Sequence, residues 1–117
     1  ADRRRIACLD EARAMFEGED GVVEQLVEVF LRELPRTVAD LHKGAADMDF
    51  ARLRELGHMI KGSVGVFSVQ RAVDAARRLE ELAAAGDPRA LTSQAGLAVR
   101  EMELLGEVLR DEVGKGA

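Results

Sequence analysis

The sequence predicts an all-α protein, an antiparallel up-down four-helix bundle with a short extra helix at its N-terminus. No segment alternates apolar and polar residues with the period of two that a half-buried strand requires. Apolar residues recur instead with the helical spacing of about 3.6 residues along four long segments. Only short links separate these segments, and short links place consecutive helices antiparallel.

The composition agrees with this fold. The chain has 117 residues, which suits a single domain spanning residues 1–117, and 47% of them are hydrophobic, which suffices for one core. With four Phe and neither Trp nor Tyr, the core must consist of Leu, Val, Ile, Met and Ala. These residues, together with many Arg and Glu, favour helices.

The first two predicted helices differ in length. Asp10 caps a short helix that ends near Glu17, and Asp20 caps a long one that closes at residues 44–47. Pro35 lies inside the long helix. Because proline removes a backbone donor and clashes with the preceding turn, we expect it to kink or divide this helix. The apolar stripe of the long helix comprises Val22, Val23, Leu26, Val27, Phe30, Leu34, Val38 and Leu41.

Three more helices are predicted over residues 50–66, 69–85 and 88 to about 113. Asp49 and Ser68 can cap the first two of these. The run Gly86-Asp87-Pro88 combines a C-terminal glycine, an N-cap aspartate and a first-turn proline, which marks a helix end followed by a new start.

The helix over residues 50–66 carries an unusual polar face. His58 lies about 130° from the centre of the apolar stripe, so we expect its side chain to be exposed. Arg54, Lys61, Gly62 and Gly65 share the side of His58. An exposed histidine with cations and glycines on the same side of the helix predicts a functional surface.

Three glycines interrupt this helix, and each costs about 1 kcal/mol relative to alanine in a helix interior. Gly57 lies on the apolar side, where it lets another helix approach closely. Gly62 lies on the exposed side and indicates that something outside the chain must come close. For Gly65, close approach and simple loosening of the helix end are equally good explanations.

These residues suit the transfer of an anionic group. An imidazole is a nucleophile, and Lys61 offers mobile positive charge to phosphoryl oxygens. Gly62 leaves room for a partner beside His58. Phosphoryl transfer depends mainly on positioning and charge neutralisation, so an exposed helix face can serve when a partner supplies the rest of the site.

The run His58-Met59-Ile60-Lys61-Gly62-Ser63-Val64-Gly65-Val66-Phe67 resembles the signature of histidine-containing phosphotransfer (HPt) domains, and also the phosphotransfer domain of chemotaxis kinases. The resemblance extends to Leu79-Glu80, Gly86-Asp87 and the helix of Phe30-Leu31 and Pro35. Two positions depart from it: Ser68 stands where the family usually has glycine, and Gly57 where it usually has alanine. The second departure affects the spacing between helices.

The resemblance implies a phosphorelay intermediate without stand-alone kinase activity. His58 would accept a phosphoryl group from a receiver-domain aspartate or a kinase and pass it to a response-regulator aspartate. Lys61 would hold the phosphoryl group. The chain itself would bind no cofactor, because Mg²⁺ belongs to the partner receiver domain. The expected docking surface comprises Arg54, Met59, Gly62, Ser63, Gly65 and Val66, with Met15 and Phe16 of the leading helix.

The position of Glu80 opposite His58 can be predicted from helix geometry alone. His58 and Glu80 are each 11 residues from Val69, where an antiparallel hairpin would turn. They should therefore face each other, and the carboxylate could accept a hydrogen bond from the imidazole and increase its basicity. A solvated surface charge is the alternative interpretation of Glu80.

Other functions fit the sequence less well. A net charge of −5 without a basic stripe argues against nucleic-acid binding. One cysteine, Cys8, excludes an intrachain disulfide, and no apolar run approaches a membrane span, so we expect a cytoplasmic protein. We also expect this protein to be a monomer. Glu55-x-x-His58 forms half of a di-iron motif, but His42 lacks the matching glutamate, so no metal site is predicted.

Two questions stay open at this point. The chain could be a receiver-docking or structural helical module that is never phosphorylated, although the presence of His58 argues against that alternative. The sequence also fits either a free protein or a domain excised from a larger sensor kinase.

Overall fold

A computed structural model of the protein describes Leu9, Ala14 and residues 21–67 and 70–116. These residues contain no strand and form helices α2 (Val22–Ala46), α3 (Phe50–Val64), α4 (Gln70–Ala85) and α5 (Pro88–Gly116), with a 3₁₀ turn, η2 (Gly65–Phe67), after α3. The predicted all-α fold is confirmed. Apart from Ala14, the expected leading helix over residues 10–17, with Met15 and Phe16, lies outside the described residues, as does the expected cap Ser68. The expected Asp20 cap is wrong, because the N-cap of α2 is Gly21, which has a φ of 91° and no side-chain cap.

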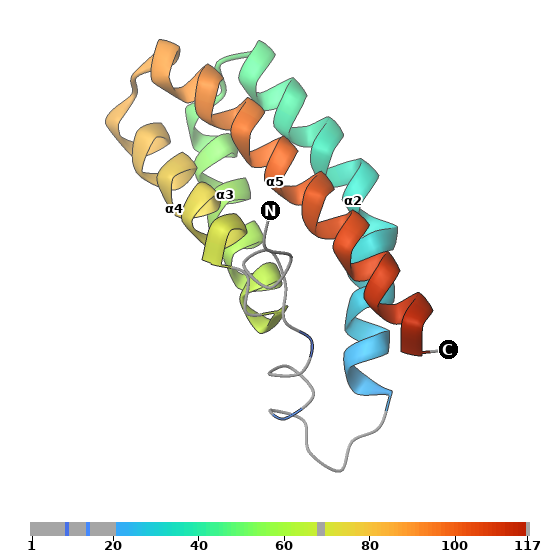
Figure 1. Cartoon of the computed structure of the whole chain (residues 1–117). Coiled ribbons are helices and arrows are strands. Elements are labelled where there is room, and N and C mark those ends of the chain that lie inside the picture. Colours follow the sequence, from blue (N-terminus) through green and yellow to red (C-terminus); the bar gives the residue numbers. More distant parts are fainter. Residues whose placement is uncertain (1–8, 10–13, 15–20, 68–69, 117) are drawn as a thin grey trace.

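The four helices form an antiparallel bundle (Figure 1). Helices α2 and α4 each pack against both α3 and α5, so α3 and α5 lie across the bundle from each other. With 25 and 29 residues, α2 and α5 are much longer than α3 and α4, which have 15 and 16. The short pair therefore covers only part of the long pair, and the polar face of α3 lies on the outside.

Helix α2 runs through Pro35 without interruption, so the helix is not divided at this residue. Pro35 is exposed, while Leu34 beside it is buried. At this turn α5 comes very close, since a Cβ built on Gly106 would lie 2.7 Å from Leu34 Cδ2. Packing of the buried face against α5 holds the helix together where proline removes one hydrogen bond.

The predicted helix starts at Asp49 and Asp87 are confirmed. Asp49 Oδ1 accepts a hydrogen bond from the backbone N–H of Arg52 at 3.0 Å. Asp87 Oδ1 accepts one from Ala90 at 3.2 Å, and Gly86 adopts the left-handed φ of 73° that favours glycine. Helix α3 ends two residues earlier than predicted, because Gly65–Phe67 tightens into the 3₁₀ turn.

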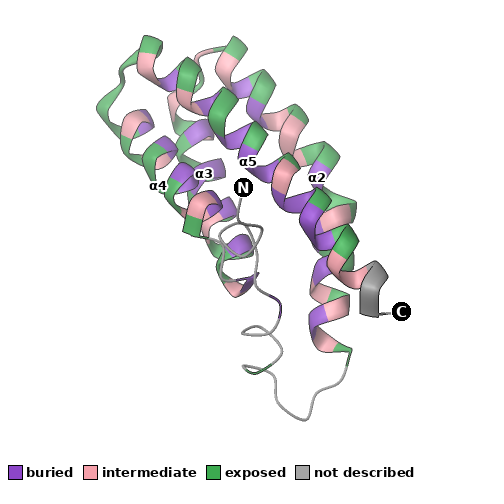
Figure 2. Cartoon of the chain, in the orientation of Figure 1, coloured by how far each residue is buried: buried purple, intermediate pink, exposed green. Residues whose placement is uncertain are grey.

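The apolar stripes meet in a single core (Figure 2). At one end, the Phe30 and Phe67 rings pack edge to face with centroids 5.8 Å apart, which joins α2 to the end of α3. Arg71 on α4 pairs at 2.8 Å with Glu101, a buried carboxylate of α5. The largest fully buried side chains are Phe67, Leu41, Leu53, Leu56, Ile60, Leu79, Leu91, Leu105, Leu109, Val27 and Val64.

Candidate functional site

His58 projects from the outer face of α3. Its side chain is 77% exposed, whereas Leu56, Gly57 and Ile60 around it in the sequence are buried. The helical periodicity of the sequence predicts this exposure, and the structure confirms it. An imidazole in this position is accessible to the active site of another protein.

Glu80 of α4 lies directly against His58. The distance between His58 Nδ1 and Glu80 Oε2 is 3.1 Å, which is within hydrogen-bonding range. The hairpin register predicted from the sequence is therefore confirmed, and Glu80 is not a freely solvated surface charge. In the neutral imidazole, a carboxylate acceptor at Nδ1 places the ring proton on that nitrogen and leaves the lone pair on Nε2.

Lys61 binds the same carboxylate. Its Nζ donates to Glu80 Oε1 at 3.0 Å, and its side chain is about one-third exposed (34%). The hydrogen bond from Lys61 is the main cause that lowers the pKa of Glu80 below its ordinary value of 4.5, against the opposing effect of burial. Glu80 is therefore ionised at neutral pH, and Lys61 is engaged with it instead of extending freely into solvent.

Gly57 explains why α4 can bring Glu80 so close. A Cβ built on Gly57 would lie 2.8 Å from the Ala76 carbonyl oxygen and 3.0 Å from the Glu80 backbone nitrogen. Both are backbone atoms, which cannot rotate out of the way. The absence of a side chain just before His58 thus sets the short spacing between α3 and α4, as predicted for a glycine on the apolar side.

Gly62 and Gly65 have no such internal role. A Cβ built on either would meet nothing within 4 Å among the described residues. Gly62 is exposed one turn after His58, and Gly65 is exposed at the start of the 3₁₀ turn with an ordinary φ of −57°. The space beside Gly62 is open to an approaching partner.

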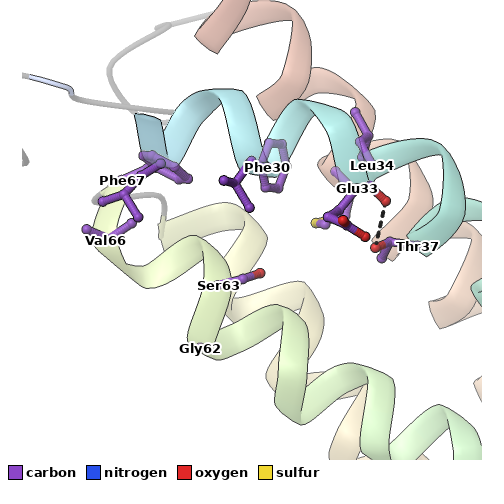
Figure 3. A pocket seen from close by; sticks show the side chains of 11 residues that line it. Phe30, Glu33, Leu34, Thr37, Gly62, Ser63, Val66 and Phe67 are labelled. Atoms are coloured by element: carbon purple, nitrogen blue, oxygen red, sulfur yellow. Dashed lines mark hydrogen bonds between the residues drawn. The ribbon is translucent and has the colours of Figure 1, made fainter. Parts of the chain in front are cut away.

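An apolar groove of about 350 Å³ opens between α2 and α3 (Figure 3). Gly62 and Ser63 form part of its wall, so it begins one turn from His58. Ser63 is exposed and donates through Oγ to the Ile60 carbonyl oxygen at 3.1 Å. We call this site the α2–α3 groove; its lining comprises Leu26, Val29, Phe30, Glu33, Leu34, Thr37, Gly62, Ser63, Val66, Phe67 and Met102.

The α2 side of this groove is absent from the sequence-based prediction. Val29 is 45% exposed and Glu33 is exposed, and neither belongs to the predicted apolar stripe. The sequence did contain a signal for Val29, because it is an apolar residue that lies outside the predicted apolar stripe. Of the other predicted surface residues, Met59 is 48% exposed and Arg54 is exposed one turn before His58.

Two further properties concern the described part of the chain. Within residues 21–67 and 70–116, no three His, Cys, Asp or Glu side chains come together in a group that could hold a metal ion. No helix described there has an apolar stretch long enough to cross a membrane.

Comparison with known proteins identifies the family of this chain. The family model described as the Hpt domain matches residues 25–113, which include both helices of the His58–Glu80 pair. A curated relative, the phosphorelay intermediate protein YPD1 of Candida albicans, is 27% identical over 74 residues, which cover 63% of this chain and 40% of that protein. No solved structure matches the chain. By its helical bundle and by the family match, the chain belongs to the Hpt domain family.

Proposed function

We propose that this chain is a phosphorelay intermediate. His58 accepts a phosphoryl group from a receiver-domain aspartate or a kinase and passes it to a response-regulator aspartate. One observation carries the proposal: an imidazole that is 77% exposed has a carboxylate 3.1 Å from its Nδ1. Membership of the Hpt domain family supports it, as does the similarity to a phosphorelay intermediate protein.

The hydrogen bond to Glu80 prepares Nε2 for attack. In the proposed step, the Nε2 lone pair forms a P–N bond while the P–O bond of the aspartyl phosphate breaks. The electron pair of that bond leaves with the aspartate carboxylate. The positive charge that develops on the ring lies next to the Glu80 carboxylate, which stabilises it. Transfer to the second receiver domain is the reverse of this step.

The chain brings the nucleophile, and the partner brings the remainder of the site. Phosphoryl transfer needs positioning and neutralisation of charge on the phosphoryl oxygens. The receiver domain would supply Mg²⁺ and the reacting aspartate, and this chain would bind no metal of its own. Lys61, held beside His58 by Glu80, would contribute positive charge from the near side.

The α2–α3 groove supports docking of a protein partner. It lies one turn from His58 and combines the bare backbone at Gly62 with the exposed apolar side chain of Val29. Contiguous exposed apolar surface marks sites where proteins or other ligands bind. We expect an apolar helix of the receiver domain to cover this groove, with Met59 at its border.

The proposal is tested with receiver domains that carry an aspartyl phosphate formed from a small acyl phosphate and Mg²⁺. Over a time course of incubation, the wild-type chain should gain a phosphoryl group whose bond to the protein is acid-labile and base-stable. The His58→Gln variant should remain unlabelled, with an unchanged circular-dichroism spectrum. Equal labelling of both proteins would refute the assignment. A chain that binds receiver domains without ever being labelled would instead be a docking module.

A further inference from the structure

A second cation, Arg54, lies on the surface beside His58 and has no part in the phosphotransfer step proposed above. Arg54 lies four residues before His58, about 40° around the helix axis and about 6 Å along it. Helical side chains lean toward the N-terminus, so the His58 imidazole leans toward the turn that carries Arg54. Arg54 and Lys61 therefore flank the imidazole from opposite directions along α3.

Unlike Lys61, Arg54 is uncommitted. Its exposed side chain makes no hydrogen bond or ion pair within residues 21–67 and 70–116. The adjacent carboxylate, Glu55, binds Arg52 at 2.6 Å. In the antiparallel register set by His58 and Glu80, position 54 faces Ala84, which offers no charge.

Charge balance gives this free guanidinium a function. Lys61 and Glu80 form an ion pair at 3.0 Å and neutralise each other. A phosphoryl group adds a charge of about −1.5 to −2 at neutral pH. The trio of His58, Lys61 and Glu80 therefore leaves most of the new negative charge without a partner. Among the described residues, Arg54 is a cation on the same face of α3 whose side chain has no partner.

Building on the proposed function, we propose that Arg54 is a phosphoryl-binding residue that folds back over His58 when Nε2 is phosphorylated. Its planar guanidinium can donate two parallel hydrogen bonds to two phosphoryl oxygens, which the Lys61 ammonium cannot do. Because the arginine side chain is exposed and has no partner among residues 21–67 and 70–116, no ion pair described there has to break. Arg54 would hold the phosphoryl group from one side and Lys61 from the other.

The test uses phosphoramidate, which requires no protein partner. Its P–N bond breaks, its nitrogen leaves as ammonia, and a new P–N bond forms to His58 Nε2. The phosphorylated protein is then titrated while the ³¹P NMR shift is followed. An adjacent cation lowers the pKa of a phosphoryl group. In Arg54→Gln we expect this pKa to rise by about half a unit, with a smaller rise in Arg54→Lys.

Arg100→Gln is the matched control. Arg100 is an exposed arginine on α5, which lies across the bundle from α3, so its removal changes the net charge equally without affecting the site. Its ³¹P titration should coincide with that of the wild type. A titration of Arg54→Gln identical to that of Arg100→Gln would overturn the role of Arg54 while leaving the phosphorelay function standing. Failure of phosphoramidate to label His58 in the wild type would count against the phosphorelay function itself.

Discussion

Glu80 lies on α4, 22 residues after His58, yet its carboxylate Oε2 lies 3.1 Å from the Nδ1 atom of the imidazole. The other oxygen of the same carboxylate accepts a hydrogen bond from Lys61 at 3.0 Å. One carboxylate thus orients both the proposed nucleophile and its neighbouring cation.

Replacing Glu80 should change the tautomer of His58. In Glu80→Ala no carboxylate accepts from Nδ1, so ¹⁵N NMR of the neutral ring should show less of the Nδ1–H tautomer. Labelling by a phosphorylated receiver domain should slow on the order of tenfold, by analogy with carboxylates that orient metal-ligating histidines. Glu81→Ala is the control, because Glu81 pairs with Arg78 instead. Tautomer populations equal to those of the wild type would contradict this role.

Gly57→Ala should destabilise the bundle. The new Cβ would press on backbone atoms of Ala76 and Glu80, at 2.8 and 3.0 Å. Overpacking of this kind costs about 1–3 kcal/mol and outweighs the gain of about 1 kcal/mol in helix propensity. We expect a net loss of up to about 2 kcal/mol in the free energy of unfolding, measured by urea denaturation. Gly96→Ala in α5, where a Cβ meets nothing within 4 Å, should instead be stabilising.

Gly62→Gln should separate docking from chemistry. A side chain at Gly62 meets nothing inside the described structure, so folding should be unharmed or improved by up to about 1 kcal/mol. The same side chain would stand between His58 and a docked receiver domain. Transfer from a phosphorylated receiver domain should fall on the order of tenfold or more, while labelling by phosphoramidate stays unchanged. Equal loss of both reactions would argue against a docking role.

Val29→Glu should weaken receiver docking through the α2–α3 groove. Val29 is 45% exposed at the groove, so a charge there leaves the core intact but opposes burial under an apolar partner surface. We expect a higher receiver concentration at half-maximal transfer rate. Leu97→Glu is the control, since Leu97 is similarly exposed, at 40%, but lies on α5. Similar effects of both changes would show that the groove has no special part in docking.

The pH dependence of stability should show the ionisation of Glu80. Its pKa is lowered below 4.5 in the folded protein, chiefly by Lys61, so the folded state binds this proton less readily than the unfolded state. The resulting stabilisation is present above pH 4.5 and disappears as the pH falls through the lowered pKa. The difference in urea stability between wild type and Glu80→Gln should shrink across that range. In Lys61→Met, NMR titration should place the pKa of Glu80 nearer its ordinary value.

The helices and the exposure of His58 could be predicted because they depend on local information. Asp49 and Gly86-Asp87-Pro88 define helix ends through their own backbone and side-chain chemistry. Helical periodicity then determines which face His58 occupies. The opposition of His58 and Glu80 was also predictable, because a tight hairpin leaves little freedom in the register of its two helices.

Tertiary structure decided the features that depend on how two helices are rotated and spaced. Pro35 illustrates this, since packing of α2 against α5 keeps helical a segment that local rules would kink or divide. The α2–α3 groove arises only when Val29 and Gly62, which are distant in sequence, meet across the helix interface. The ion pair of Lys61 with Glu80 likewise required the three-dimensional arrangement. Sequence thus determined the helices and the outward histidine, whereas the packing of side chains between helices determined its surroundings.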